Sequence, residues 1–217
     1  MKYIISDIHG EYNKFIRMLE LINFSSNDTM LILGDVIDRG KKSIDTLLHV
    51  MNSSNMELLL GNHEDMALKS LIDKETGYYN CWMGNGGYST LQQFDNLSIH
   101  KRHTILNYLQ NCELYKIVDN YIFVHAGINT SIKFSNIKSF MEEQDTETLL
   151  WDRMEGGVSG IKGYTIISGH TPTKYFHNIT PMTIWNNKDR IVIDCGACFK
   201  GGQLSCLRLD DMKEFYI

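Results

Sequence analysis

The sequence predicts an α/β protein in which two mixed sheets pack face to face between outer layers of helices, a four-layer α/β/β/α sandwich. Two observations lead to this fold class. The first half of the chain alternates short apolar segments with helix-like stretches, which is the pattern of βαβ units. Strand-like segments dominate after residue 113 and again after residue 163, so the second half supplies strands for a further sheet.

The individual elements follow from hydrophobic pattern. Buried strands are expected where continuously apolar or β-branched segments occur, at residues 2–6, 30–33, 57–60, 121–124 and 165–168. Helices are expected over about 11–22, 42–51 and 64–72, with a helical excursion over about 88–111. We expect residues 1–217 to form one domain, in which about 73–111 are inserted as a helical cap beside the site.

Each expected strand runs into a short polar motif that contains glycine. The motifs are Asp7-Ile8-His9-Gly10, Gly34-Asp35-Val36-Ile37-Asp38-Arg39-Gly40, Gly61-Asn62-His63-Glu64, His125-Ala126-Gly127 and Gly169-His170-Thr171. Loops beyond strand ends are where open α/β sheets carry their chemistry, and glycine permits close backbone approach there. One such aspartate or histidine alone is more often a turn former, a helix cap or a core residue. Five motifs together indicate a single site.

The residue types in these motifs suit metal ions. Carboxylate, imidazole and amide oxygen bind manganese, iron or zinc, and two such ions about 3.5–4 Å apart can activate a water for in-line attack on phosphorus. Because only a carboxylate can bridge two cations, we place Asp35 between the metals. The remaining ligands are Asp7 and His9 for the first site and Asn62, His125 and His170 for the second. We expect two divalent ions, manganese in preference to iron or zinc, with a bridging hydroxide and a local charge of roughly +1 that attracts phosphate.

On these residues the chain resembles the metallophosphoesterases, and within them the phosphoprotein phosphatases, especially the compact bacterial and bacteriophage-lambda type of serine/threonine phosphatase. The resemblance covers nearly the whole chain, including 82–87, Trp151-Asp152-Arg153 and 193–197. It implies the same metal ligands and the four-layer fold, and it adds Arg39 and Arg153 as arginines that bind phosphate.

The resemblance also implies a proton donor. His63 would protonate the leaving oxygen, and Asp38 would orient His63. The residue types agree with these roles, because histidine is best suited to proton transfer near neutral pH. A partnered carboxylate is expected to fix the tautomer of His63 and to raise its pKa.

Three functions are consistent with these motifs. The first is a serine/threonine or dual-specificity protein phosphatase, with a phosphorylated protein or a small phosphoester as substrate. The alternative is a hydrolase similar to the symmetrical diadenosine tetraphosphatases, whose C-terminus is similar to residues 202–211. Those enzymes are longer, commonly lack a carboxylate at the place of Asp38 and carry Asp where this chain has Glu64. A non-catalytic binding protein is disfavoured, because it would be free to lose the cluster of buried charges.

Several residues keep a structural interpretation beside the functional one. Arg153 has acidic neighbours for a surface salt bridge, namely Asp145, Glu147, Asp152 and Glu155. Gly86-Gly87 is either functional or a loop tip. The cap aromatics, Tyr78, Tyr79, Trp82 and Tyr88, are either substrate contacts or a small core. The histidines outside the motifs, His49, His100, His103 and His177, are expected to be surface or packing residues.

Composition narrows the class of protein. A hydrophobic fraction of 43% and a charged fraction of 22% are typical of a soluble globular protein. Five cysteines are expected to be reduced thiols, and Cys195-Gly196-Ala197-Cys198 is expected to serve packing despite its redox-motif spacing. A net charge of −5 without a basic stripe argues against nucleic-acid binding. No apolar run suggests a membrane span and no signal peptide is visible, so a cytoplasmic location is expected.

Overall fold

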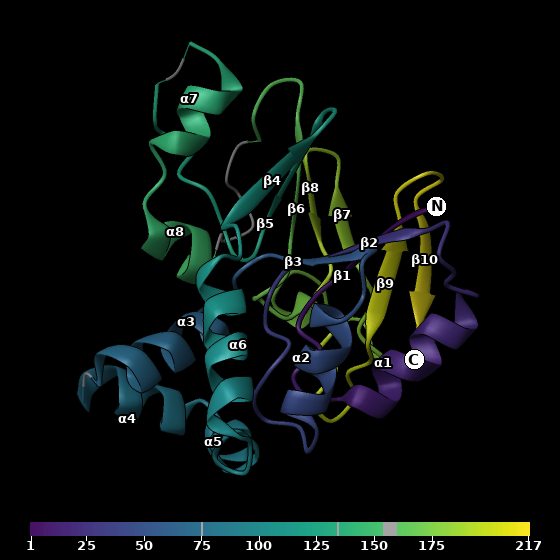
Figure 1. Cartoon of the computed structure of the whole chain (residues 1–217). Helices are drawn as coiled ribbons and strands as arrows, with labels where there is room; N and C mark the ends of the chain where they lie inside the picture. Colours follow the sequence, from purple (N-terminus) through teal and green to yellow (C-terminus); the bar gives the residue numbers. More distant parts are fainter. Residues whose placement is uncertain (75, 134, 154–159) are drawn as a thin grey trace.

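Two five-stranded sheets form the centre of the described part of the chain (Figure 1). The computed structural model describes residues 1–217 except 75, 134 and 154–159. The strands are β1 (Lys2–Ile5), β2 (Thr29–Ile32), β3 (Met56–Leu58), β4 (Tyr115–Val118), β5 (Tyr121–Val124), β6 (Thr165–Ser168), β7 (Trp185–Asn187), β8 (Arg190–Val192), β9 (Ser205–Arg208) and β10 (Lys213–Tyr216). The first sheet has the order β10-β9-β1-β2-β3 and the second β4-β5-β6-β8-β7.

Helices connect and cover these strands. They are α1 (Tyr12–Leu21), α2 (Ser43–Met51), α3 (Asn62–Leu68), the π-helical turn η1 (Lys69–Asp73), α4 (Thr76–Gly84), α5 (Tyr88–Asp95), α6 (Ile99–Gln110), α7 (Ile137–Glu142), α8 (Thr146–Trp151) and the 3₁₀ turn η2 (Thr173–Tyr175). The described residues between β3 and β4 are mainly helical, from α3 to α6. None of the helices in the described ranges is both long and apolar enough to cross a bilayer.

The strands that precede the motifs are parallel within each sheet. In the first sheet β1 pairs with β2 and β2 pairs with β3, both in parallel, and β5, β6 and β8 are parallel in the second. Parallel neighbours end at the same edge, so the loops that follow them meet there. This arrangement brings the five polar motifs together from positions more than 160 residues apart, as the 2.9 Å hydrogen bond between Asp7 and His170 shows.

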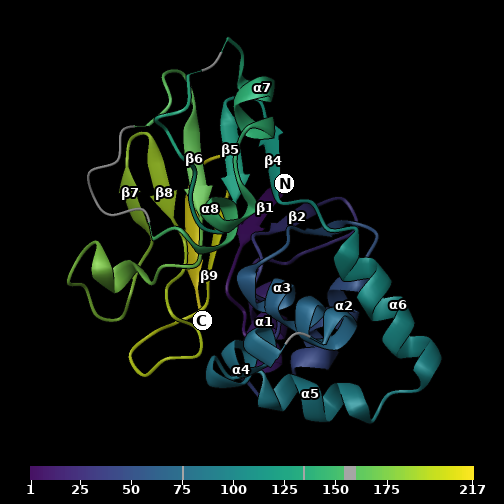
Figure 2. The ribbon, with the colours of Figure 1, turned by 90° about the vertical axis from the view of Figure 1, so that its left-hand side faces the viewer.

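The layers follow from alternation along the strands. In β1, Ile4 belongs to the core between the two sheets, whereas Ile5 packs with Phe15 of α1 in the core beneath the helices. In β6, Ile167 faces the same intersheet core, whereas Ile166 packs with residues of α7 and α8. Figure 2 shows α7 and α8 over one face of the second sheet, with α1 and α2 on the far side of the first. The four-layer α/β/β/α prediction is confirmed.

The expected strands and helices are found within a few residues of their predicted bounds, but α7 and α8 were not predicted. Residues 125–163 were assigned to the strand-rich half, and each of these helices has only 6 residues, too few for a helical period to show. Their N-caps were the available signal. Asn136 accepts a hydrogen bond from Ser139 N at 3.0 Å and Asp145 accepts one from Thr148 N at 2.7 Å.

Candidate metal centre

The six predicted metal ligands lie together at the edge where the parallel strands end. All are buried: Asp7, His9, Asp35, Asn62, His125 and His170. They come from the loops after β1, β2, β5 and β6 and from the first residue of α3, which follows β3. Buried polar groups at this density require compensating partners.

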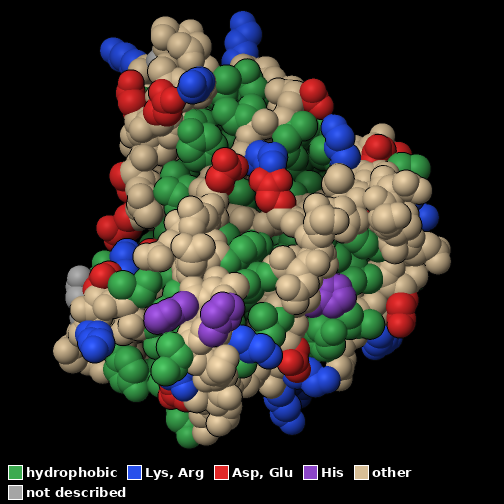
Figure 3. Space-filling view, in the orientation of Figure 1, with side chains coloured by type: hydrophobic (Ala, Val, Ile, Leu, Met, Phe, Trp, Pro, Cys, Tyr) green, Lys and Arg blue, Asp and Glu red, His purple; other side chains and the backbone are tan. Residues whose placement is uncertain are grey.

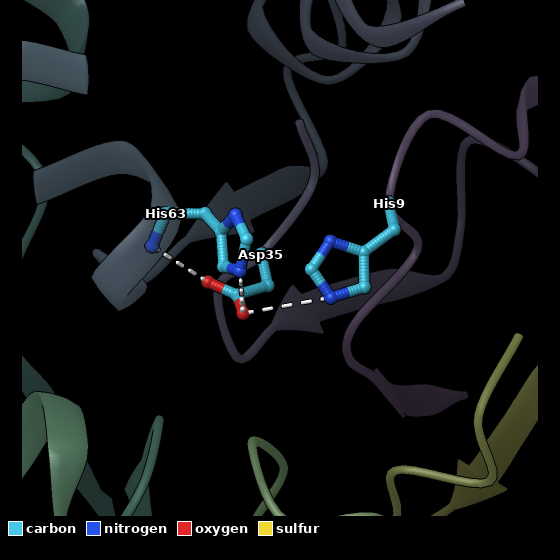
Figure 4. A group of neighbouring side chains, drawn as sticks. All are labelled: His9, Asp35 and His63. Carbon is cyan, nitrogen blue, oxygen red and sulfur yellow. Dashed lines mark hydrogen bonds and ion pairs between the residues drawn. The ribbon is translucent and has the colours of Figure 1, made fainter. Parts of the chain in front are cut away.

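Asp35 lies at the centre of the cluster. Its Oδ2 is 3.7 Å from His9 Nε2, and its Oδ1 is 3.5 Å from His125 Nε2. Figure 4 shows the Asp35 side chain between His9 and His63, with Oδ1 also accepting the backbone N–H of His63 at 3.1 Å. The two oxygens therefore face different imidazoles, as a bridging carboxylate requires.

The remaining ligands occupy the two sides of Asp35. Asn62 Oδ1 lies 2.9 Å from His125 Nε2 and 3.1 Å from His170 Nδ1, which groups these three side chains. Asp7 Oδ1 is 3.9 Å from His9 Nε2, while its Oδ2 accepts the backbone N–H of His170 at 2.9 Å. Asp7 thus contacts residues of both expected groups, and the division of the ligands between two ions stays a prediction.

Two sets of three side chains each have donor atoms that lie within 4.8 Å of one another. One set is His9, Asp35 and His63, and the other is Asp35, His125 and His170. The first set includes His63, the expected proton donor, in the place where Asp7 was expected. His63 Nε2 is 3.9 Å from Asp35 Oδ2, so distance alone permits His63 to act as a ligand. A test of leaving groups, described in the Discussion, separates the two roles.

Two imidazoles are oriented by backbone carbonyls. His9 Nδ1 donates to Ile37 O at 3.0 Å, and His125 Nδ1 donates to Leu33 O at 2.7 Å. A proton on Nδ1 leaves the lone pair on Nε2, and in both residues Nε2 faces Asp35. Burial, followed by the nearby His63 and Arg39, lowers the pKa of His9 well below its usual value, which favours the neutral form that binds metals.

The buried carboxylates need positive charge. Burial and then Asp194 raise the pKa of Asp7 well above its usual value, and burial and then Glu64 do the same for Asp35. Burying several carboxylates without cations is costly, whereas divalent ions bound among them favour the ionised form. The donor set and its orientation therefore fit divalent metal ions.

The backbone of the site is strained. Six of the predicted site residues have left-handed conformations: Asp7 (φ 49°), His9 (φ 48°), Asp35 (φ 56°), Asp38 (φ 73°), Arg39 (φ 64°) and His170 (φ 62°). Each such residue costs about 1–3 kcal/mol and persists only where its surroundings hold it, which is typical of functional sites. All six strained residues lie in the loops that follow β1, β2 and β6.

Glu64 holds the strained loop that carries Asp35. Its buried carboxylate accepts the backbone N–H groups of Asp35 at 2.8 Å, Val36 at 2.9 Å and Gly61 at 3.1 Å. A Cβ at Gly61 would lie 2.3 Å from Asp35 Oδ1, so glycine is required there. We did not predict this role for Glu64, although a glutamate at the third position of a helix is the signature of a capping box.

His63 and Asp38 form a buried pair. His63 Nδ1 lies 2.6 Å from Asp38 Oδ2, which fixes the tautomer as expected. Two residues of the helical insertion also bond the Asp38 carboxylate. Trp82 Nε1 donates to it at 2.9 Å and Thr90 Oγ1 donates to it at 2.5 Å. Trp82 is thus a buried positioning residue rather than a substrate contact.

The expected pKa of His63 was wrong in direction. Burial, followed by the charges of Arg39 and His125, lowers the pKa of His63 well below its usual value. Burial also raises the pKa of Asp38 to about 7, against the hydrogen bonds from Thr90 and Trp82. Both shifts favour uncharged forms, because the pair is more deeply buried than its sequence setting suggested. A phosphate dianion beside Arg39 would favour the imidazolium again.

Arg39 reaches over the cluster from the loop after β2. Its Nη1 is 2.7 Å from His9 Nε2 and its Nη2 is 3.0 Å from His63 Nε2, so this exposed side chain must release the lone pair of His9 Nε2 before that atom can bind an ion. Its backbone N–H donates to Gly86 O at 3.1 Å. A Cβ at Gly86 would lie 2.9 Å from Arg39 Cγ, and one at Gly87 would lie 2.5 Å from Trp82. The glycine pair is therefore needed for close packing and is not a free loop tip.

Comparison with known proteins decides the family. The sequence description of the calcineurin-like phosphoesterases matches residues 3–197. The chain belongs to the calcineurin-like phosphoesterase family. Members of this family are metal-dependent hydrolytic phosphoesterases, which agrees with the His and Asp clusters described above.

Relatives of this phosphoesterase carry two kinds of name. Serine/threonine-protein phosphatase 2 of Escherichia coli (strain K12) is 40% identical, over 95% of this chain and 92% of that protein. The symmetrical bis(5'-nucleosyl)-tetraphosphatase of Buchnera aphidicola (subsp. Baizongia pistaciae) is 41% identical, over 98% of this chain and 96% of that protein. A protein serine/threonine phosphatase from Saccharomyces cerevisiae shares the fold, with a TM-score of 0.64 at 16% identity over 100% of this chain and 78% of that one.

Arg153 lies at the margin of the phosphoesterase site. It is exposed and follows α8, and its charge contributes, after burial and His125, to lowering the pKa of His170 to about 2. Of the acidic neighbours considered for it, Asp145 instead caps α8, and Glu155 lies outside the described residues. Phosphate binding by Arg153 remains a prediction.

The other candidates lie outside the metal cluster of the phosphoesterase. Figure 3 shows histidine side chains on the surface over α6 and α2, which carry His100, His103 and His49. His177 contacts Thr183 O at 3.0 Å. Tyr79 and Tyr88 are exposed, and Tyr78 packs against Lys69. All five cysteines are free, with Cys195 buried, while Cys198 Sγ is 3.8 Å from Arg39 Nη1, a contact that its sequence setting did not suggest.

Proposed function

We propose that this phosphoesterase hydrolyses phosphomonoesters with two divalent ions, and that its preferred substrates are phosphoserine and phosphothreonine in proteins, with phosphotyrosine as a further substrate. The observation that carries the proposal is the buried pair of His63 Nδ1 and Asp38 Oδ2 at 2.6 Å. Alkyl esters such as phosphoserine have poor leaving groups, so their hydrolysis needs an oriented proton donor. By the family resemblance described above, the symmetrical tetraphosphatases commonly lack a carboxylate at the place of Asp38, which favours the protein phosphatases.

The ion ligands in this proposal are those that surround Asp35. Asp7 and His9 would hold the first ion, Asn62, His125 and His170 the second, and the two oxygens of Asp35 face both groups. Bound ions would lower the pKa of a water and withdraw charge from the phosphate oxygens. Mixed oxygen and nitrogen ligation suits manganese, with iron and zinc as alternatives.

The protein side chains supply orientation and a proton. Arg39 offers a planar guanidinium within 3.0 Å of His63 Nε2, so a phosphate oxygen held by Arg39 lies near the proton donor. Nε2 of His63 is the atom from which the leaving oxygen would take its proton, since Nδ1 is bonded to Asp38. Trp82 and Thr90 keep Asp38 from rotating.

A second function has specific support. The bis(5'-nucleosyl)-tetraphosphatase named above is 41% identical to this chain. In that case the scissile bond is a phosphoanhydride, whose leaving phosphate departs more readily than an alkoxide. The demand for a proton donor is then smaller. Hydrolysis of diadenosine tetraphosphate is therefore the alternative that must be measured directly.

The deciding experiment compares initial rates on three substrates under one set of conditions with added manganese. These are a phosphoserine peptide, a phosphotyrosine peptide and diadenosine tetraphosphate. We expect the highest kcat/KM on the phosphoserine peptide. A higher kcat/KM on diadenosine tetraphosphate would replace the proposed substrate class with the alternative.

Removal of the metal is expected to abolish activity. The purified protein should hydrolyse an aryl phosphate, lose this activity on exhaustive chelation and regain it with manganese, because water activation and phosphate binding are both assigned to the ions. The measurement is the rate before and after chelation, with elemental analysis of the protein. Full activity in protein shown to be metal-free would rule out the proposed mechanism.

A further inference from the structure

A pair of cations shares one aromatic ring at the rim of the site. Phe199 lies in the loop after β8 and is 40% exposed. The guanidinium carbon of Arg39 is 5.4 Å from its ring centroid, and Nζ of Lys174 is 5.5 Å from the same centroid. Both cations are therefore within reach of a ligand that covers Phe199.

Lys174 is held by rings rather than by a carboxylate. Its Nζ also lies 5.1 Å from the ring centroid of Tyr175, which is 64% exposed. Among the residues that the structure describes, no carboxylate forms an ion pair with Lys174. Two positive charges near one ring repel each other, and an anion that contacts both would offset that repulsion.

Backbone and side-chain contacts hold the segments of the rim and Arg39 together. Thr173 N donates to Asp194 O at 2.8 Å, which ties the turn that carries Lys174 to the loop that carries Phe199. Phe199 N donates to Gly196 O at 2.9 Å, and Arg39 Nη1 contacts Cys198 Sγ at 3.8 Å. The distance between Lys174 Nζ and the guanidinium carbon of Arg39 is therefore at most twice the distance of Lys174 from the ring.

We propose that Lys174, positioned by Phe199 and Tyr175, binds a second anionic group of the substrate while Arg39 holds the scissile phosphate. The inference rests on the proposed function, because it takes Arg39 as the phosphate-binding arginine. In an extended peptide, side chains two residues apart project about 7 Å apart on the same side, which the spacing of the two cations permits. The second anion is either a carboxylate near the phosphorylated residue or a further phosphate of a polyphosphate.

The test compares Lys174→Gln with a matched control. Lys213 also lies over an aromatic ring, 5.0 Å from the centroid of Phe215. In the first sheet Lys213 lies opposite Arg208 of β9, and Arg208 lies opposite Tyr3 of β1. Tyr3 is near the start of β1, whereas the site follows the end of that strand. Lys213→Gln therefore makes the same change in charge and ring contact far from the site. Lys174→Arg keeps the charge and should restore the function.

The substrates separate the sources of the anion. They are a phosphoserine peptide flanked by glutamate, the same peptide flanked by glutamine, diadenosine tetraphosphate and an aryl phosphate. We expect Lys174→Gln to lower kcat/KM by about fivefold, mainly through KM, only on substrates with a second anion, and we expect salt to reduce the difference. A loss confined to the acidic peptide assigns the carboxylate, and a loss confined to the tetraphosphate assigns the phosphate.

Two results would overturn the role of Lys174. One is that Lys174→Gln keeps the wild-type preference for substrates with a second anion over those without one. The other is an equal loss of kcat/KM on every substrate including the aryl phosphate, which would indicate a structural effect. Failure of the proposed function looks different. In that case the wild-type protein itself would lack metal-dependent hydrolysis of the aryl phosphate, whatever residue stands at position 174.

Discussion

His63→Asn is expected to slow hydrolysis of a phosphoserine ester by on the order of 10²–10⁴, the usual worth of general acid–base catalysis. It should slow hydrolysis of an activated aryl ester much less. A nitrophenolate leaves without a proton, so its transition state gains little from the donor that Asp38 orients at 2.6 Å. The penalty should therefore shrink as the pKa of the leaving group falls.

The measurement is kcat/KM over a graded series of esters, in protein shown to hold its metals. Asp38→Asn should give the same trend with a smaller amplitude, because it acts through His63. Arg39→Ala and Arg153→Ala should penalise all esters alike, since they would remove the proposed contacts to the phosphate itself. If the His63 penalty did not depend on the leaving group, His63 would be a metal ligand or a phosphate contact, as its place near His9 and Asp35 permits.

Asp35→Asn is expected to empty both metal sites, whereas Asp7→Asn should mainly empty the first. The two oxygens of Asp35 lie 3.7 Å from His9 Nε2 and 3.5 Å from His125 Nε2, and a neutral amide is a poor bridge between two cations. The measurement is metal content per protein for each variant. Two ions retained in Asp35→Asn, or equal losses in both variants, would contradict a bridging role for Asp35.

The clustering of the six candidate ligands could be predicted because its signals are local. A buried strand followed by Asp, Asn or His with glycine beside it is readable from the sequence, and parallel pairing brings such loops to one edge. The central position of Asp35 followed from chemistry, since a bridge between cations must be a carboxylate. The structure places all six ligand side chains in one buried cluster.

The surroundings of the ligands could not be predicted because they depend on tertiary contacts. Thr90 and Trp82 reach Asp38 from the helical insertion, 52 and 44 residues away in sequence, and nothing in their local sequence indicates a carboxylate partner. The pKa of His63 was predicted from its one partner, whereas burial, a property of the whole fold, sets its direction. The contact of Lys174 with Phe199 joins two loops whose sequences are unrelated.

The left-handed residues have a consequence for evolution and engineering, because their strained backbone lowers the free energy of unfolding. Arg39 is exposed and has φ 64°, so Arg39→Gly is expected to raise the free energy of unfolding by up to about 1 kcal/mol while removing a phosphate contact. Arg17→Gly, at an exposed position of helix α1, should lower it by about 0.5–1 kcal/mol. Chemical denaturation of both variants measures the difference. A glycine scan should likewise raise the melting temperature at left-handed residues outside the site, such as Lys188 (φ 49°), so a gain of stability marks backbone strain and not the site itself.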